Sequence, residues 1–435
     1  MVGWEKIKFG NIADFKNGIN FSKDQKGNSG IPTIDVKNMF GNTCYVNLGN
    51  LYSVNKNINN DYYLRNGDIL FVRSSLKEEG VGWTSLYRGS ELSHSFCGFI
   101  IRARLNEHNR DKYDPEFLTY FFRSDALRKE LISLSGRVAI TNVNQGLLKS
   151  LIFQIPPLPE QRKIAYILST VQKAIEQQDK LIKTTTELKK ALMQKLFTEG
   201  LYGEKQKQTE IGPVPESWEV VELKKYLLKT VLKDPTKNPN DKFVYIDVSS
   251  VSNDFFKIAY PKTMLGKDAP SRARKLIQEG DVIFATVRPT LKRIAKVNSD
   301  YHNQICSTGY VVLKPNQKFL TQEFLYQYVQ TEYFINRIEK LQRGASYPAV
   351  RDTDVKGMLI PLPKLNIQQE IGSVLATFDK KMSIIQKKKQ TLSDLFKTML
   401  HELMTGQRRV NEIDFENDKE ELLMAAEPKM EYNKE

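Results

Sequence analysis

A proline-led helical pattern occurs twice in the chain and constrains the fold more than any other feature. The first copy follows residues 155–159 and ends near Gly200, and the second follows residues 360–363 and ends near Gly406. Proline ends the element before it and is tolerated only ahead of a helix or in its first turn. Apolar residues then recur at alternating steps of three and four over roughly five heptads, as in a coiled-coil seam. The predicted seam residues are Leu168, Val171, Ile175, Ile182, Leu188, Leu192, Leu375, Phe378, Met382, Ile385, Leu392 and Phe396.

Two such helices in one chain are expected to pack against each other. Each spans on the order of 35–40 residues, or roughly 55 Å at 1.5 Å per residue. Packed antiparallel, they would hold the segments that precede them at opposite ends of a rod. The distance between these two segments would then be set by the length of the rod.

The segments ahead of the two helices match each other at a spacing of about 210 residues. The triplet Ile34-Asp35-Val36 returns at 246–248, and the turn Gly67-Asp68 returns at 280–281 ahead of a similar apolar run. Order is preserved throughout, which indicates a tandem duplication with pseudo-two-fold symmetry. We therefore predict an α+β fold with two similar globular domains separated by a long antiparallel two-helix coiled coil.

Short apolar runs after turn signals predict strands in both copies. These runs are 69–72, 99–101, 282–285 and 310–313. One helix per copy is expected at 114–134 and 321–341, with Asp114 and Thr321 as capping residues. For the second long helix, Asn366 and Gln369 have the spacing of a capping box.

These signals divide the chain into six segments. Pro213 and Pro215 mark a hinge ahead of the second domain. The predicted segments are a first globular domain at 1–154, a first long helix at 155–200, a linker at 201–215, a second globular domain at 216–359, a second long helix at 360–406 and an acidic tail at 407–435.

Composition limits the class of protein. The 435 residues carry 65 Lys and Arg against 51 Asp and Glu, a net charge of +14, which favours a polyanionic partner such as nucleic acid. No apolar run approaches the roughly 20 residues that span a bilayer, and no signal peptide is evident. Three scattered cysteines argue against a disulfide framework and, together with these features, predict a cytoplasmic protein.

No catalytic or metal-binding set emerges. The chain has neither a GxxxxGK[ST] phosphate loop nor a glycine-rich cofactor turn after a strand. Its four histidines lack metal-ligand spacing. Asp68 and Asp281 sit at matched turns, where bonding of the side chain to the turn backbone explains them. We expect no catalytic residue, no metal and no cofactor on this chain.

The loops carry side chains of the kind that read base edges. Arg pairs with guanine, Asn with adenine, and Ser or Thr with either. Basic and polar groups follow the matched triplets, the matched strands and the matched glycine loops, so both copies present them at equivalent places. The candidate DNA-binding residues are Lys37, Asn38, Arg73, Ser74, Ser75, Arg137, Thr141, Asn142, Ser249, Ser250, Arg288, Thr290, Arg343, Ser346 and Tyr347.

At this point the chain resembles the specificity subunits of type I restriction–modification systems over about residues 1–406. The resemblance is carried by the paired proline openings, by 160–164 (Glu-Gln-Arg-Lys-Ile) after the first of them, and by 215–220 (Pro-Glu-Ser-Trp-Glu-Val) at the start of the second domain. In the second copy, 365–370 departs from the Glu-Gln-Arg-Lys version.

The resemblance implies that each globular part is a target recognition domain. Each would read one half of a bipartite, asymmetric sequence in double-stranded DNA, and the two helices would set the gap. Two adenine-N6 methyltransferase subunits would dock on the chain, and restriction subunits would join through them. S-adenosylmethionine, ATP and Mg²⁺ would then be bound by those partners.

Two alternatives stay open on the residues alone. One is a self-contained DNA methyltransferase or nuclease with fused recognition domains, against which the missing cofactor loop argues. The other is a coiled-coil scaffold without a nucleic-acid role, against which the basic composition argues.

Overall fold

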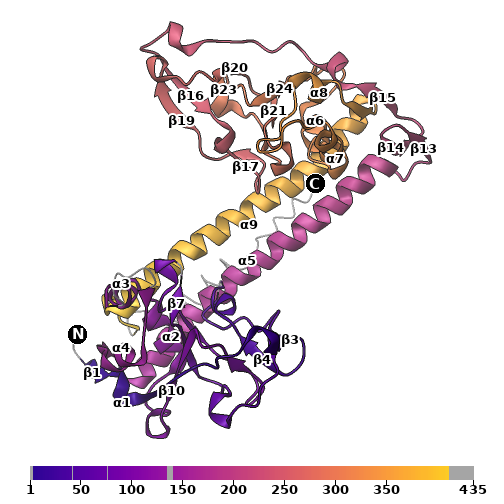
Figure 1. The fold of residues 1–435 in the computed structure, drawn as a ribbon. Coiled ribbons are helices and arrows are strands. Elements are labelled where there is room, and N and C mark those ends of the chain that lie inside the picture. Colours follow the sequence, from indigo (N-terminus) through magenta and orange to yellow (C-terminus); the bar gives the residue numbers. More distant parts are fainter. Residues whose placement is uncertain (1–2, 42, 76, 135–140, 411–435) are drawn as a thin grey trace, which may run out of the picture. The chain divides into compact units, whose positions relative to one another are not determined.

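The computed structural model describes residues 3–41, 43–75, 77–134 and 141–410, and the chain forms two compact units. Unit 1 comprises Met1–Lys180 and Lys387–Glu435, and unit 2 comprises Leu181–Gln386. Two long helices, α5 (Leu158–Glu199) and α9 (Leu365–Thr405), each contribute one part to either unit (Figure 1). The predicted acidic tail lies outside the described residues from position 411 on.

In its described residues, unit 1 combines small sheets with four short helices. A four-stranded sheet has the order β2-β10-β6-β8, a second has the order β3-β5-β4-β9, and β1–β12 and β7–β11 form separate pairs. The strands are β1 Glu5–Lys8, β2 Ala13–Asn17, β3 Lys26–Gly27, β4 Ile31–Ile34, β5 Tyr52–Val54, β6 Ile69–Val72, β7 Ser74–Ser75, β8 Thr84–Leu86, β9 Ser95–Phe96, β10 Ile100–Leu105, β11 Thr141–Asn142 and β12 Ile152–Ile155. The helices are α1 Phe9–Ile12, α2 Pro115–Arg123, α3 Asp125–Leu134 and α4 Gln145–Ser150.

Unit 2 has the same kinds of element. Its sheets have the orders β19-β16-β23-β20 and β22-β21-β24, and β13–β14, β15–β25 and β17–β18 form pairs. The strands are β13 Gln206–Thr209, β14 Gly212–Pro215, β15 Glu219–Glu222, β16 Lys242–Ile246, β17 Val251–Ser252, β18 Lys257–Ile258, β19 Lys262–Leu265, β20 Ala273–Ile277, β21 Val282–Ala285, β22 Ile294–Lys296, β23 Gln304–Ser307, β24 Tyr310–Leu313 and β25 Leu359–Leu362. The helices are α6 Gln322–Tyr328, α7 Glu332–Lys340 and α8 Asp352–Lys356.

Each unit has an aromatic core that includes the long helices. In unit 1, the rings of Phe9 and Phe122 lie 4.7 Å apart, and Leu168 of α5 and Met399 of α9 belong to the same buried cluster. In unit 2, Phe197 of α5 packs edge-on against Phe324 at 5.3 Å. Burial of such large apolar side chains is the main stabilising term of each unit.

The predicted strands at 69–72, 282–285 and 310–313 are confirmed as β6, β21 and β24. The strand predicted at 99–101 is β10, which begins one residue later and leaves Phe99 61% exposed. The predicted caps Asp114 and Thr321 are also confirmed, since each side chain accepts the N–H of the residue three positions on.

The prediction of one helix per copy at 114–134 and 321–341 is wrong, because each range holds two helices. In unit 1, Ser124 adopts an extended backbone between α2 and α3. In unit 2, the side chain of Thr331 accepts the N–H of Phe334 and so caps a new helix, α7, three residues after α6. Serine and threonine readily bond local backbone groups, which allows them to interrupt a helix.

Both long helices end where predicted. Gly200 and Gly406 follow the last helical residues with φ of +72° and +66°, a left-handed conformation that glycine adopts without steric cost. The predicted capping box at Asn366 is wrong, because α9 begins at Leu365 and Asn366 lies inside it. The strand ahead of each long helix pairs with the first strand of its globular part. Ile155 lies opposite Glu5 in unit 1, and Leu362 lies opposite Glu219 in unit 2, so Ile155 and Leu362 occupy equivalent positions.

The seam assignment needs one correction. Leu188 is 57% exposed, whereas Thr185 and Lys189 are 7% and 9% exposed. A 3–4 step pattern continued from Ile182 reaches 185 and 189, so Leu188 lies one residue off the seam. The prediction chose Leu188 because it is apolar, but in this part of the seam the helix buries the polar residues Thr185 and Lys189. None of the other predicted seam residues is exposed.

Within each unit, the segments of α5 and α9 run antiparallel. In unit 1, Arg409 pairs with Glu160 at 2.9 Å and Lys389 pairs with Asp179 at 2.5 Å. In unit 2, Lys189 pairs with Asp379 at 2.5 Å, and the Tyr202 hydroxyl donates to Glu370 at 3.3 Å. Arg409 and Tyr202 lie just beyond the ends of α9 and α5, and in both units rising positions on the first segment contact falling positions on the second.

The predicted linker contains regular structure. The linker predicted at 201–215 contains the β13–β14 pair, in which Gln206 lies opposite Pro215. No helix in the described ranges is long and apolar enough to cross a membrane.

Candidate nucleic-acid interface

The candidate interface starts from a tight turn that both units share. Gly67 and Gly280 adopt φ of +91° and +87°, and the following aspartate closes the turn. Asp68 accepts the N–H of Arg65 at 2.7 Å, and Asp281 accepts that of Gln278 at 2.9 Å. This is the turn-bonding role predicted for both aspartates. Each turn leads into a strand, β6 or β21, that is buried along its whole length.

The residue after each strand is held by the same two backbone bonds. In unit 1, the Arg73 N–H donates to the Phe99 carbonyl at 2.8 Å, and the Arg73 carbonyl accepts the Val143 N–H at 2.9 Å. In unit 2, Thr286 makes the same two bonds, to the Gly309 carbonyl and with the Val350 N–H, at 2.8 and 2.9 Å. These two backbone bonds form what we call the frame, and the frame is equivalent in both units. It positions the residues that follow Arg73 and Thr286.

A glycine permits close packing beside this frame in each unit. A Cβ atom added at Gly98 would lie 2.1 Å from the Asn20 side chain, and one at Gly309 would lie 2.8 Å from the Val248 side chain. Contacts under 3 Å are not tolerated by real side chains without movement. These glycines let the strand-end loop approach its neighbours.

In unit 1, the frame brings together the predicted residues of two separate loops. Strands β7 and β11 pair Ser74 with Asn142 and Ser75 with Thr141. The Ser74 hydroxyl donates to Oδ1 of Asn142, whose side chain is exposed. Arg73 is half-buried, and its Nη1 lies 3.4 Å from the Gly98 carbonyl. Arg137 lies outside the described residues.

In unit 2, the equivalent frame presents an arginine and a tyrosine. Val287 bridges to Ala349, and the Arg288 N–H donates to the Pro348 carbonyl at 2.7 Å. The Arg288 guanidinium lies 4.7 Å from the centre of the Tyr347 ring, which is 70% exposed. This unit therefore exposes a cation stacked on an aromatic face.

Two further predicted residues lie beside this pair. The Ser346 carbonyl accepts a bond from Nη2 of Arg288 at 3.3 Å. Thr290 is exposed on the short 3-10 helix η10 (Pro289–Leu291) that follows Arg288. The structure thus brings Arg288, Thr290, Ser346 and Tyr347 together.

The turns after the matched Ile-Asp-Val triplets correct two predictions. Asn38 and Ser250 are 4% and 0% exposed, and each accepts the N–H of the aspartate three residues before it. Both serve as partners in capping boxes, so the predicted DNA contacts of Asn38 and Ser250 are wrong. A buried, satisfied side chain cannot reach a base edge. Their neighbours Lys37 and Ser249 are exposed.

Arg343 differs from Arg288 in having a carboxylate partner. Its guanidinium pairs with Asp354 at 2.5 Å, and this bond lowers the pKa of Asp354 and raises the pKa of Arg343. An exposed ion pair of this kind contributes little to stability. The pairing draws the guanidinium toward α8.

The prediction did not include Phe99. It is an exposed aromatic whose carbonyl accepts the Arg73 N–H, so it lies at the edge of the unit 1 frame. Exposed aromatic rings are platforms for unpaired bases and anchors in grooves. The only sequence signal was an aromatic at the start of an apolar run, and that signal equally describes a strand.

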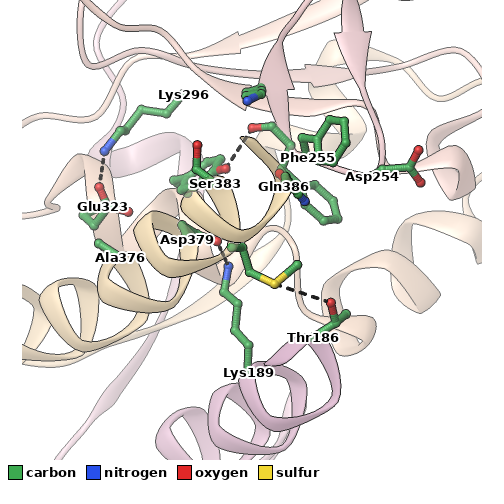
Figure 2. A pocket seen from close by; sticks show the side chains of 14 residues that line it. Thr186, Lys189, Asp254, Phe255, Lys296, Glu323, Ala376, Asp379, Ser383 and Gln386 are labelled. Carbon is green, nitrogen blue, oxygen red and sulfur yellow. Dashed lines mark hydrogen bonds and ion pairs between the residues drawn. The ribbon is translucent and has the colours of Figure 1, made fainter. Parts of the chain in front are cut away.

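Unit 2 also contains a cavity of about 310 Å³ that Figure 2 shows from close by. Two ion pairs, Lys189–Asp379 and Lys296–Glu323, lie in its wall. These four charges are neutralised in pairs, as in a structural interface, and Asp254 and Lys257 also line the cavity. Across the described part of the chain, no cluster of three or more His, Cys, Asp or Glu could hold a metal ion.

Comparison with known proteins gives a consistent result. A family model described as "Type I restriction modification DNA specificity domain" matches residues 1–184 and 215–394. The chain is 29% identical over 418 residues to the "Putative type I restriction enzyme MjaX specificity subunit" of Methanocaldococcus jannaschii, covering 94% of each chain. It is 28% identical over 374 residues to the type I restriction enzyme MjaVIII specificity subunit of the same organism, covering 81% of this chain and 86% of that one.

A solved structure supports the fold. The S subunit of a type I restriction–modification system from M. genitalium covers 92% of this chain and 96% of its own, with a TM-score of 0.57 at 16% identity. The family model covers most of this chain in two blocks, each of which holds one globular part. The chain therefore belongs to the family of type I restriction–modification DNA specificity domains.

Proposed function

We propose that this chain is the non-catalytic DNA-recognition subunit of a type I restriction–modification complex, and that each unit reads one half of a bipartite target. The observation that carries this proposal is the shared backbone frame after β6 and β21. The two frames use equivalent bonds and expose different side chains. A duplicated scaffold with unlike chemistry suits two unlike half-sites.

The two long helices suit the role of a spacer between these readers. Each is a single helix of 42 or 41 residues, about 60 Å at 1.5 Å per residue. Antiparallel ion pairs join the helices in unit 1 and again in unit 2. Together with the matched turns and strands, these pairs support the duplicated, pseudo-symmetric arrangement with a coiled-coil rod.

An exposed apolar stripe on the helices supports docking of partner subunits. Leu181 and Leu188 lie one heptad apart on α5 and are 44% and 57% exposed, and Ile384 of α9 is 59% exposed. Exposed apolar side chains grouped on a helix face favour a partner helix. We assign this stripe to methyltransferase subunits, with restriction subunits joining through them. S-adenosylmethionine, ATP and Mg²⁺ are then expected on those subunits.

The test is methylation by the chain assembled with its methyltransferase subunits. The expected target has two short specified parts separated by a gap of fixed length and unspecified sequence. Changing one part should abolish methylation, and changing the gap sequence should not. Duplex binding should weaken with salt, with log K falling about 0.9 per phosphate contact against log[salt]. A single contiguous target would contradict the proposal.

A further inference from the structure

We propose that the two readers differ in the base that anchors them: Arg288 of unit 2 selects a guanine, and Asn142 of unit 1 selects an adenine. This inference rests on the function proposed above and assigns one specified position in each half of the target. It follows from what the equivalent frames expose. The position that carries Arg288 in unit 2 carries Ser75 in unit 1.

Arg288 is held in a conformation that costs energy. Its φ of +48° and ψ of +56° lie in the left-handed region, which residues other than glycine, asparagine and aspartate rarely adopt. Lys292, at the other end of η10, is also left-handed with φ of +52°. Two such residues flanking one exposed turn point to a functional constraint on that turn.

The surroundings of Arg288 orient the side chain without neutralising it. Its Nη2 donates to the Ser346 carbonyl, and its guanidinium stacks on Tyr347. Among the residues that the structure describes, no carboxylate lies within ion-pair distance of Arg288. Arg343, in the same region, has such a partner in Asp354. The Arg288 guanidinium is therefore held in one orientation, and no carboxylate of the described residues neutralises its charge.

Guanine fits this group better than the other bases do. In the major groove, guanine presents two adjacent acceptors, N7 and O6, which match two parallel N–H groups of the planar guanidinium. Thymine and cytosine present no such pair, and adenine places a donor where guanine has O6. The stacked Tyr347 ring limits the rotation of the guanidinium plane, which favours a bidentate contact.

Asn142 has the complementary pattern. The Ser74 hydroxyl occupies one lone pair of Oδ1, which fixes the amide orientation. The second lone pair of Oδ1 and the Nδ2 hydrogens can then meet N6 and N7 of adenine, which present one donor and one acceptor. Asparagine makes this bidentate contact with adenine through the side chain alone.

The experiment is methylation-aware sequencing of DNA from cells in which variants of the full chain assemble with their methyltransferase subunits. Arg288→Ala should relax one G·C position in one half-site, with discrimination there falling about 5- to 150-fold. Arg288→Met keeps an unbranched stem, removes every N–H donor and should relax the same position. Asn142→Ala should relax one A·T position in the other half-site. The gap length should stay unchanged in all three.

Arg337→Ala is the matched control. Arg337 also lies over a tyrosine, Tyr333 at 5.8 Å, but its Nη1 donates to the Glu210 carbonyl between β13 and β14, and its backbone belongs to α7 and not to the frame after β21. This variant should leave every position of the target unchanged.

The outcomes separate the two proposals. A target that is not bipartite in the unaltered protein contradicts the proposed function. A bipartite target that stays fully specified in Arg288→Ala, or that relaxes at an A·T pair, overturns the assignment of guanine. If Arg288→Ala abolishes all methylation, Arg288→Met decides by the same criterion. An Asn142→Ala target unchanged at every A·T position overturns the assignment of adenine.

Discussion

Gln161 and Gln368 make the same pair of hydrogen bonds in the two units. Gln161 donates to the Pro156 carbonyl at 2.8 Å and accepts the Asp114 N–H at 2.9 Å. Gln368 donates to the Pro363 carbonyl at 2.9 Å and accepts the Thr321 N–H at 2.8 Å. Each buried glutamine thus ties the start of a long helix to the cap of a short one.

Replacing either glutamine by alanine should destabilise its unit. Gln161→Ala leaves a buried carbonyl and a buried N–H without partners, and each such group costs about 1–3 kcal/mol. We expect the free energy of unfolding to fall by about 2–4 kcal/mol, measured by denaturant titration followed by circular dichroism. Gln368→Ala should have a similar effect in unit 2.

Exposed glutamines on the same helices provide the controls. Gln177 of α5 and Gln369 of α9 are exposed, and alanine is the better helix former. Gln177→Ala and Gln369→Ala should change stability by no more than about 0.5 kcal/mol. Equal losses in Gln369→Ala and Gln368→Ala would show that the paired bonds are not the cause.

Asp281, the aspartate of the second matched turn, should make the stability of unit 2 depend on pH. Burial raises the pKa of Asp281 to about 6, above the value of about 3.9 for an unfolded chain. The folded state therefore binds this proton more tightly, so the carboxyl contributes stability that is present at acid pH and lost as pH rises through about 6. Asp281→Asn, which can still accept the Gln278 N–H, should be stabilising at pH 7.5 and nearly neutral at pH 4.5. Thermal unfolding at the two pH values measures this difference.

Asp68 is the control for this prediction. Its carboxylate receives two bonds from Arg104, both 2.7 Å, and both side chains are largely buried. Asp68→Asn leaves the guanidinium without its counter-charge and should cost about 3–5 kcal/mol at pH 7.5. If Asp68→Asn were stabilising, the claim that the Arg104 pair stabilises the first turn would be wrong. If Asp281→Asn changed stability equally at both pH values, the claim that the pKa of Asp281 is raised would be wrong.

The two ion pairs that join α5 and α9 should differ in strength. The Lys189–Asp379 pair is the more buried, and Gln327 also donates to Asp379 at 2.7 Å. The Lys389–Asp179 pair has both side chains about one-third exposed. A double-mutant cycle to alanine should give a coupling energy of about 1–2 kcal/mol for the first pair and below about 1 kcal/mol for the second. The reverse order would contradict this account of burial.

Local turn chemistry made much of the fold predictable. The pair Gly67-Asp68 determines its own turn, and its copy at 280–281 does the same, so strands β6 and β21 follow at the expected residues. The ends of the long helices were predictable for the same reason, because Gly200 and Gly406 act within a single turn.

Features that depend on tertiary partners were not predictable. Asn38 and Ser250 belong to residue types that read bases, but their side chains are consumed by local caps. Leu188 fits an apolar seam by type, but the buried positions nearby are Thr185 and Lys189, and Lys189 is buried because Asp379 pairs with it.

The role of the paired glutamines was in principle visible in the sequence. Each lies five residues after a proline, Pro156 or Pro363. The two predicted proline openings, 155–159 and 360–363, do not begin at equivalent residues, because Ile155 corresponds to Leu362, and this offset conceals the shared spacing. In the same way, the contact of Ser74 with Asn142 joins residues 68 positions apart, and the sequence placed them only on separate loops.

The central claim is that the paired helices set the gap between two DNA readers. The test adds four helical residues after Thr186 of α5 and four after Met382 of α9, two residues that contact each other across the pair. Four residues add about 6 Å and rotate the helix about 40° past a full turn. One to two base pairs of DNA add a comparable rise and rotation. A four-residue insertion at Gly203, which lies outside both helices, is the control.

Methylation-aware sequencing of cells that carry these variants reports the gap directly. We expect both half-sites to stay unchanged and the gap to lengthen by one or two base pairs in the helix variant alone. Methylation of the original target with the original gap by the helix variant would contradict the claim.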